Sequence, residues 1–209
     1  MICYLDVDGV MRDLAAFYKS VHPEYPDITA YYTPAFNTLW KEFVTDRNKA
    51  REMYTGAPVV NGAAEAYRLL KKAFGKVTYL TANGKKEYPW LTGYTKQFLK
   101  KHGFLNSGDD IIFVDKAEEK LAVLDRDPGV LFDDKVHTIL KLPDSSTGVW
   151  VMNNMTGDIP VFMRKTRGRN IYTVKDMTGC DRSLMEWLVS QKVLDDSVIN
   201  RLYEEKSNV

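Results

Sequence analysis

The sequence has few of the residues that build disulfide frameworks or soft-metal sites. It contains two cysteines, Cys3 and Cys180, and three histidines, His22, His102 and His137, among 209 residues. The cysteines lie far apart and have no metal-binding spacing, and the histidines are scattered along the chain. We therefore expect neither a zinc site nor a dependence on disulfides, and a reducing compartment fits best.

An excess of charge and a long apolar run are also lacking. Lysine and arginine number 29 and aspartate and glutamate 28, so the formal net charge of +1 gives no case for general nucleic-acid binding. No run is long enough to cross a bilayer. Asp6 and Asp8 interrupt the apolar N-terminal stretch, which argues against a signal peptide. We expect a cytoplasmic protein without a membrane partner, and the sequence does not indicate its oligomeric state.

Short apolar runs alternate with helical patterns, which is typical of an α/β fold with a parallel sheet. The runs are rich in valine, isoleucine, tyrosine and phenylalanine, as strands buried on both faces are. The predicted strands cover residues 1–7, 76–82, 110–115, 129–134, 147–153 and 170–174. The predicted helices cover residues 61–74, 94–104, 116–129 and 182–206.

Residues 14–57 have a different composition. They are crowded with aromatic residues and interrupted by Pro23, Pro26 and Pro34, and they contain no run that reads as a buried strand. We predict that they form a small helical cap inserted after the first strand. The remaining residues, 1–13 and 58–209, would then form one core domain.

Polar residues follow four of the predicted strands. They are Asp6 and Asp8 after the first strand, Thr81 at the end of the second, Lys116 after the third, and Asp133 and Asp134 at the end of the fourth. In open parallel sheets ligands bind beyond the carboxyl ends of the strands, so these side chains should meet in one crevice. Four carboxylates in a small space repel unless a cation joins them, and a few hard oxygen ligands are typical of Mg²⁺.

The same four segments carry a resemblance. "DVDGV" (6–10), "YLTAN" (79–83), "VDKAEEK" (114–120) and "VLFDD" (130–134) resemble, in order, the four motifs of the haloacid dehalogenase superfamily of phosphotransferases. Within it the sequence is most similar to the 5′(3′)-deoxyribonucleotidase group and its phage and bacterial relatives. That similarity includes Asp13 after "DGV" and the segment "GAPVVNGAAEAYRLLKK" (56–72). The resemblance covers roughly residues 1 to 140 and implies a Rossmann-like core with a cap.

The resemblance implies an aspartyl-phosphate mechanism. Asp6 would be the nucleophile that attacks phosphorus, and Asp8 would be the general acid and base. Gly9 would let the backbone turn so that both carboxylates face the phosphate. Thr81, with Ala82 beside it, would bind a phosphoryl oxygen, in a step that relies on positioning and electrostatics.

The resemblance also implies charged groups around the phosphate. Lys116 would neutralise charge on the transferred group, and it is preferred because it directly follows the strand; Lys120, one helical turn later, is the alternative. Mg²⁺ would be held by Asp6, the backbone carbonyl of Asp8 and Asp133. Asp134 would either bind a metal-bound water or orient a loop amide.

Several residues have more than one interpretation. The aromatic residues of 14–57 would mainly form a small core, with one or two of Phe17, Tyr18, Tyr32 and Trp40 available to stack on a nucleobase. Arg12 would either face the leaving group or be solvated.

The preferred function is hydrolysis of a nucleoside 5′-monophosphate, most simply a deoxyribonucleotide. Two departures from the deoxyribonucleotidase pattern, Ala82-Asn83-Gly84 after the second motif and Lys135 after the paired acids, put that substrate in doubt. A first alternative is a phosphatase acting on 3′- or 5′-phosphorylated nucleic-acid ends, and the basic segment "RKTRGR" (164–169) would be the argument for it. The acids elsewhere in the chain and the lack of a longer basic stripe favour a solvated loop for this segment instead. A second alternative is a catalytically silent binding module.

Overall fold

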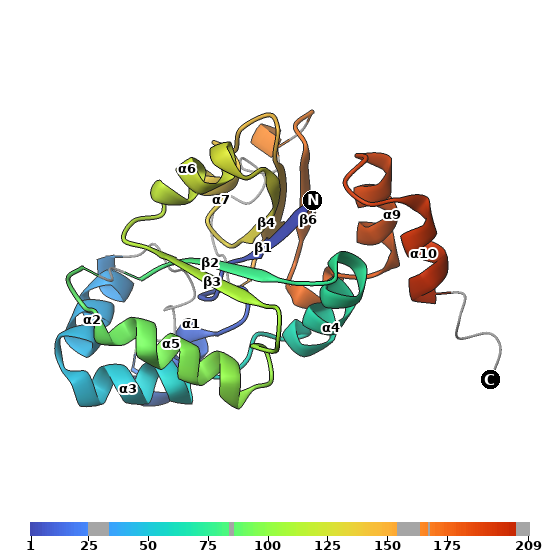
Figure 1. The fold of residues 1–209 in the computed structure, drawn as a ribbon. Helices are drawn as coiled ribbons and strands as arrows, with labels where there is room; N and C mark the ends of the chain where they lie inside the picture. Colours follow the sequence, from blue (N-terminus) through green and yellow to red (C-terminus); the bar gives the residue numbers. More distant parts are fainter. Residues whose placement is uncertain (25–33, 84–85, 154–163, 167, 204–209) are drawn as a thin grey trace.

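A six-stranded parallel sheet organises the computed structural model (Figure 1). The structure describes residues 1–24, 34–83, 86–153, 164–166 and 168–203. The strands lie in the order β3-β2-β1-β4-β5-β6, and each falls inside one of the six predicted runs. Their bounds are β1 (Ile2–Leu5), β2 (Thr78–Ala82), β3 (Asp110–Val114), β4 (Gly129–Asp133), β5 (Thr147–Val151) and β6 (Ile171–Val174).

The central strands are mainly apolar because both faces of the sheet are covered. In β1, Cys3 and Leu5 face one hydrophobic cluster and Tyr4 faces another. Leu5 pairs with Tyr79 of β2 on one side and with Phe132 of β4 on the other. This register aligns the carboxyl ends of β1, β2 and β4 at one edge of the sheet.

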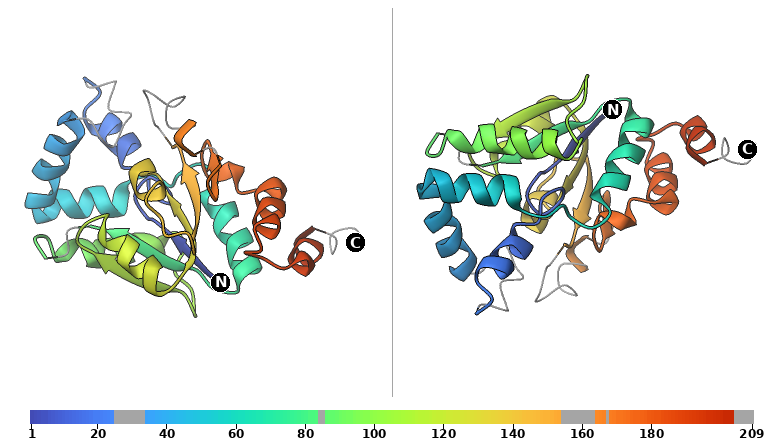
Figure 2. Two further views of the ribbon diagram at one scale, coloured as in Figure 1. Left: turned by 90° about the horizontal axis from the view of Figure 1, so that it is seen from above. Right: turned by 90° about the horizontal axis from the view of Figure 1, so that it is seen from below.

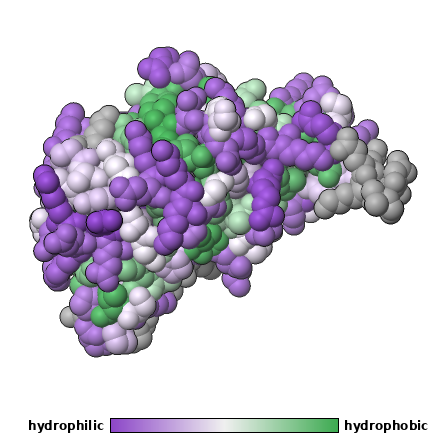
Figure 3. Space-filling model, turned by 60° about the horizontal axis from the view of Figure 1, so that its bottom comes forward, coloured by the Kyte–Doolittle hydropathy of each residue, from purple (hydrophilic) through white to green (hydrophobic). Residues whose placement is uncertain are grey.

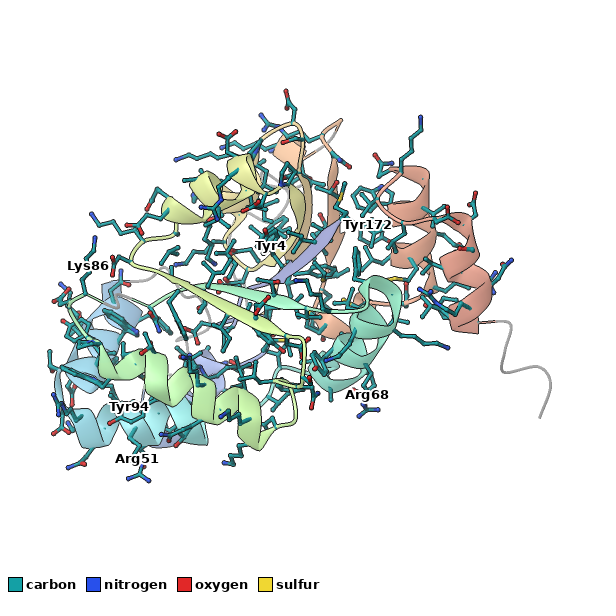
Figure 4. The ribbon with its side chains drawn as sticks, viewed as in Figure 1. Tyr4, Arg51, Arg68, Lys86, Tyr94 and Tyr172 are labelled. Atoms are coloured by element: carbon teal, nitrogen blue, oxygen red, sulfur yellow. The ribbon has the colours of Figure 1, made fainter. Side chains whose placement is uncertain are left out.

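Helices cover both faces of the sheet (Figures 1 and 2). One face packs against α4 (Ala63–Phe74), the 3₁₀ turn η1 (Met177–Gly179), α9 (Arg182–Ser190) and α10 (Asp196–Tyr203). The other packs against α6 (Glu119–Arg126) and α7 (Val136–Ile139). In Figure 4 Tyr172 extends from β6 toward α9, where its ring centroid lies 5.1 Å from that of Trp187.

The sequence predicts one helical stretch over residues 182–206. In the described part of this stretch the structure has two helices, α9 and α10. The break contains Lys192, the one described non-glycine residue with a positive φ, at 58°. Asp195 Oδ1 then accepts a hydrogen bond from the backbone N–H of Ser197, at the start of α10. A left-handed residue ends an α-helix, so the chain turns and α10 packs back against α9.

Most described residues of segment 14–57 lie in three helices. They form α1 (Leu14–Val21), α2 (Pro34–Thr45) and α3 (Arg47–Gly56). Asp13 accepts a hydrogen bond from the backbone N–H of Ala16 and so caps α1, and Asp46 caps α3 in the same way.

The apolar cluster of these three helices also includes residues of another segment. Tyr88 and Leu91, at the start of α5 (Trp90–Lys101), are buried in it. Figures 1 and 2 accordingly show α1, α2, α3 and α5 together at one end of the molecule, with α9 and α10 at the other. The division into a core of 1–13 and 58–209 and a cap of 14–57 stays a prediction.

The surface is mainly polar. Figure 3 shows one face covered largely by hydrophilic residues, with smaller apolar patches between them. Within the described ranges, Met1 and Val21 are the large apolar residues with the highest exposure. No helix that the structure describes combines the length and the apolar character needed to cross a membrane.

Asp109 connects α4 to the start of β3. Its carboxylate accepts hydrogen bonds from the Tyr67 hydroxyl at 2.6 Å, Lys71 Nζ at 2.9 Å, and the backbone N–H groups of Val77 at 3.1 Å and Asn106 at 3.0 Å. Burial alone would raise the pKa of Asp109, but these hydrogen bonds outweigh it and hold that pKa below its ordinary value.

Replacing Asp109 with asparagine should lower the free energy of unfolding by about 1–3 kcal/mol at pH 7, because Lys71 loses an ionised partner. A group whose pKa is lowered by folding stabilises the protein above its unfolded pKa, near 3.9 for aspartate, and loses that contribution as the pH falls through the folded value. In urea unfolding, the difference between wild type and Asp109→Asn should therefore be full at pH 7 and shrink below about pH 4.

The neighbouring residue provides the control. Asp110 is exposed, and its Oδ2 lies 3.5 Å from Nζ of the exposed Lys76. Asp110→Asn should therefore change the free energy of unfolding by less than about 0.5 kcal/mol. Equal losses in the two variants would contradict the role assigned to Asp109.

Candidate active site

The loop after β1 brings Asp6 and Asp8 to the carboxyl edge of the sheet. The backbone N–H of Asp6 donates to the carbonyl of Phe132 at 2.9 Å, which extends the pairing of β1 with β4 by one residue. Gly9 then has φ 82°, and a Cβ at this position would collide with the carboxylate of Asp134. Glycine is therefore required both by the backbone conformation and by the close approach of Asp134.

Lys120 lies between two of the carboxylates. Its Nζ is 2.7 Å from Asp6 Oδ2 and 2.7 Å from Asp133 Oδ2, and its side chain is completely buried. Burial alone would lower the pKa of Lys120, but Asp133 and Asp6 outweigh it and raise that pKa, so the ammonium stays charged. The structure thus brings Lys120, the alternative candidate from the sequence, to the carboxylates, whereas Lys116 has an exposed side chain at the mouth of the site.

Asp6, Asp133 and Asp134 form the cluster expected from the strand ends. Each offers an oxygen that lies within 4.8 Å of the others. Asp133 Oδ1 accepts a hydrogen bond from the backbone N–H of Lys135 at 2.7 Å. Asp134 Oδ1 is buried and has no hydrogen-bond partner within the described part of the chain.

Crowding of these acids affects their protonation. Burial raises the pKa of Asp134 well above its ordinary value, and the negative charges of Asp133 and Asp6 raise it further. Burial also raises the pKa of Asp133, against the opposing effect of Lys120. An orphaned carboxylate oxygen beside two further carboxylates is the donor set of a hard divalent cation, so these residues fit Mg²⁺.

Asp8 has a different partner. Its Oδ1 accepts from Arg12 Nε at 2.7 Å and lies 2.6 Å from Arg12 Nη2. Burial raises the pKa of Asp8, whereas the positive charge of Arg12 lowers it. Asp8 is therefore held by a cation of its own, separate from the one that holds Asp6.

Arg12 is fully buried, so the interpretation that it is solvated is wrong, whereas its position toward the leaving group stays a prediction. It donates to the carbonyl of Tyr54 at 3.0 Å and contacts Thr95 Oγ1 at 3.4 Å, and its guanidinium lies 4.0 Å from the centre of the Tyr54 ring. A buried guanidinium needs both a counter-ion and hydrogen-bond acceptors. Asp8 is the counter-ion, and the acceptors come from α3 and α5.

The end of β2 supplies Thr81, Ala82 and Asn83. Thr81 is buried at 1% exposure and pairs in register with Phe113 of β3. Asn83 is also buried, and both polar atoms of its amide lack a partner in the described ranges. Sequence reasoning used Asn83 only as a departure from a family pattern; a buried amide that is unsatisfied beside a cleft marks it as a substrate-binding candidate.

A cleft of about 470 Å³ opens over the carboxylates and is called the Asp6 cleft below. Its floor includes Asp6, Asp8 and Asp134, and its walls include Phe36, Asn37 and Trp40 of α2, Tyr54 of α3, Ala82, Asn83, Asp115, Lys116 and Lys135. Trp40 Nε1 lies 3.3 Å from the Tyr54 hydroxyl, which fixes one aromatic wall. Asp115 Oδ2 also lies 3.1 Å from Nζ of Lys86, which Figure 4 shows extending outward at this end of the molecule.

The aromatic candidates separate into three groups. Trp40 lines the Asp6 cleft, as one of the interpretations from the sequence requires. Phe17 and Tyr18 do not line it, because they pack with Phe43 in the interior of the cap helices, at centroid distances of 5.7 and 5.5 Å. Tyr32 lies outside the described residues.

The fold can be compared with known proteins. No family model and no curated protein matches the chain. A haloacid dehalogenase-like family hydrolase from Xanthomonas campestris is similar with a TM-score of 0.57 and 12% identity, over 92% of this chain and 97% of that one. A HAD family hydrolase from Deinococcus radiodurans, solved with bound phosphate and sodium, is similar with a TM-score of 0.52 and 16% identity, over 93% of this chain and 97% of that one.

A third similar structure is a haloacid dehalogenase-like hydrolase from Burkholderia xenovorans, with a TM-score of 0.50 and 16% identity over 90% of this chain and 97% of that one. The chain shares the fold of these hydrolases. The predicted α/β, Rossmann-like architecture is therefore confirmed, and the similarity extends beyond the roughly 140 residues that carried the resemblance in sequence.

Replacing Lys120 with methionine should lower the free energy of unfolding by about 3–5 kcal/mol, because Asp6 and Asp133 would be left as uncompensated buried charges. The measurement is urea unfolding of the metal-free protein at pH 7. The matched control is Lys116→Met, which removes an exposed ammonium and should change the stability by less than about 0.5 kcal/mol. Similar losses in both variants would contradict the different placements of the two lysines.

Proposed function

We propose that the protein is a Mg²⁺-dependent phosphatase that hydrolyses phosphate monoesters through an aspartyl-phosphate on Asp6. The observation that carries the proposal is the position of Asp6. Its carboxylate lies at the floor of the Asp6 cleft, 2.7 Å from the buried Lys120 and beside two further carboxylates, with Asp8 facing the same cleft.

The metal would be held by the carboxylates of Asp6, Asp133 and Asp134 together with the backbone carbonyl of Asp8. When bound, Mg²⁺ would neutralise charge on the phosphoryl group and so stabilise its transfer. The buried, unpartnered oxygen of Asp134 supports this assignment, since such an atom is costly unless a ligand satisfies it.

The chemical work of the chain would be divided between Asp6 and Asp8. A carboxylate oxygen of Asp6 forms a bond to phosphorus while the bond from phosphorus to the ester oxygen breaks, and protonated Asp8 gives its proton to the departing alkoxide. In the second half, ionised Asp8 takes a proton from water, the water oxygen bonds to phosphorus, and the bond to Asp6 breaks. Phosphate and the original Asp6 carboxylate result.

Asp8 must change protonation state between these steps, and its surroundings support both states. Burial favours the protonated acid, and the contact with Arg12 favours the ionised base. Thr81 and Lys120 would bind phosphoryl oxygens as charge develops. Lys120 takes over the charge-neutralising role that the resemblance assigned to Lys116, because it contacts Asp6 directly.

For the substrate we propose a nucleoside 5′-monophosphate. Phe36 and Trp40 give the Asp6 cleft an aromatic wall, and Asn37 and Asn83 offer amide groups beside it. An aromatic ring is a suitable stacking partner for a nucleobase. A nucleic-acid end is the second candidate, favoured by Lys135 and Lys141, which line a groove next to the cleft. The intact pair of Asp6 and Asp8 speaks against a silent binding module.

The test is phosphate release from a panel of ribo- and deoxyribonucleoside monophosphates with Mg²⁺ and with EDTA. We expect turnover that requires Mg²⁺ and a loss of activity by a factor of about 10⁴ or more in Asp6→Asn, because the nucleophile is removed. Trapping of a radiolabelled phosphate on the wild-type chain, and not on Asp6→Asn, would identify the intermediate.

Asp127→Asn serves as a control, because Asp127 is a carboxylate outside the cleft whose charge pairs with Arg126 at the surface. It should retain wild-type activity. Phosphate release that survives Asp6→Asn, or no release from any phosphate ester by the wild type, would refute the proposed mechanism.

A further inference from the structure

A second groove adjoins the Asp6 cleft. It has a volume of about 230 Å³ and lies between the start of α6 and the short helix α7, with Glu118 on one side and Lys135, His137 and Lys141 on the other; we call it the α6–α7 groove. Ala117, Glu118 and Lys135 line both cavities. A ligand seated in the Asp6 cleft can therefore extend into the α6–α7 groove over this shared boundary.

The two cavities differ in charge. The Asp6 cleft is lined by six carboxylates against two lysines: Asp6, Asp8, Glu87, Asp115, Glu118 and Asp134 against Lys116 and Lys135. The α6–α7 groove has one carboxylate, Glu118, against Lys135, Lys141 and the titratable His137. The cleft therefore suits a cation together with the phosphate it binds, whereas the groove suits an anion directly.

The lysines of the groove have no close carboxylate partner among the described residues, although the positive charge of Lys135 does partly offset the burial that raises the pKa of Asp8, Asp133 and Asp134. Lys135 and Lys141 have no ion pair with any carboxylate that the structure describes, whereas Lys120, Lys71 and Lys86 all have one. Lys135 is also half-buried at the boundary of the two cavities. A cation in such a position lacks part of its hydration, which an anionic ligand group can replace.

A third basic residue lies near the far end of α7. Arg169, from the "RKTRGR" segment, donates from Nη1 to the carbonyl of Leu140 at 2.6 Å, and Leu140 directly precedes Lys141. Arg169, whose side chain is exposed, is thus held at the far end of α7. Lys135 and Lys141 line the α6–α7 groove, and Arg169 lies beyond it, against the carbonyl next to Lys141.

We propose that the α6–α7 groove binds a second phosphate group of the substrate, on the side of the leaving group. The proposal rests on the proposed function, because the first phosphate is the one placed in the Asp6 cleft. It extends the proposed substrate from a nucleoside 5′-monophosphate to phosphate esters that carry a further phosphate. A nucleoside 3′,5′-bisphosphate and the phosphorylated end of a short oligonucleotide share this chemistry, and the preference between them is measurable.

The experiment compares kcat/KM with Mg²⁺ for a nucleoside 5′-monophosphate, the matching 3′,5′-bisphosphate and a short 5′-phosphorylated single-stranded oligonucleotide. For the wild type we expect the bisphosphate to be favoured over the monophosphate by about tenfold, the value of one good charged contact. The advantage should fall as salt is raised, because exposed lysines are screened. A kcat/KM for the oligonucleotide above that for the bisphosphate identifies a nucleic-acid end as the substrate, and a kcat/KM for the bisphosphate above that for the oligonucleotide identifies the small molecule.

Two variants test whether the groove is responsible. Lys141→Glu and the milder Lys141→Gln should lower the ratio of kcat/KM for the bisphosphate to kcat/KM for the monophosphate, bringing it toward one. Lys100→Glu, an exposed lysine of α5 outside both cavities, should leave that ratio at the wild-type value. Absence of a preference in the wild type, or an equal change in Lys100→Glu and Lys141→Glu, would overturn the proposal.

A binding measurement separates this proposal from the phosphatase itself. Calorimetric titration of Asp6→Asn with the bisphosphate in Mg²⁺ does not depend on turnover, and the added Lys141→Glu change should weaken binding about tenfold. Bisphosphate binding that depends on Lys141, without turnover by the wild type, supports the groove and refutes the proposed function. Turnover of the monophosphate by the wild type, with no effect of Lys141→Glu on bisphosphate binding, supports the proposed function and refutes the groove.

Discussion

The contact of the Lys120 ammonium with Asp6 and Asp133 is the interaction on which the rest of the site depends. Asp6 follows β1 and Asp133 ends β4, so one buried cation joins the ends of two adjacent central strands. Moving three charges out of water is expensive, and only their mutual attraction in good geometry compensates for it. Asp134 lies beside this group, and Gly9 in turn lies directly against Asp134.

The sheet and its polar edge could be predicted from the sequence because parallel strands buried on both faces read as short apolar runs. Asp6, Asp133 and Asp134 follow or end such runs, so their meeting needed only the rule that parallel strands end at one edge. The strands and the longer helices followed in the same way, but the short helix α7 and the turn η1 were not predicted. The break at Lys192 was also missed, because the helical pattern of the sequence continues through a residue with a left-handed backbone conformation.

The choice between Lys116 and Lys120 could not be made from distance along the chain. A turn separates β3 from α6, with the backbone N–H of Glu119 bonded to the carbonyl of Lys116 at 3.1 Å, and the helix begins only at Glu119. Lys116 therefore extends to the surface, and Lys120, one turn later, returns to the strand ends. The burial of Arg12 was equally hidden, because a charged residue reads as exposed unless its tertiary partners are known.

Arg12 also has a mechanical consequence. One guanidinium touches Asp8 in the loop after β1, the Tyr54 carbonyl of α3 and the Thr95 hydroxyl of α5, and Tyr54 belongs to the wall of the Asp6 cleft. A displacement of α3 that widened the cleft would stretch the same contacts that hold Asp8. Arg12 therefore couples the width of the cleft entrance to the orientation of the Asp8 carboxylate.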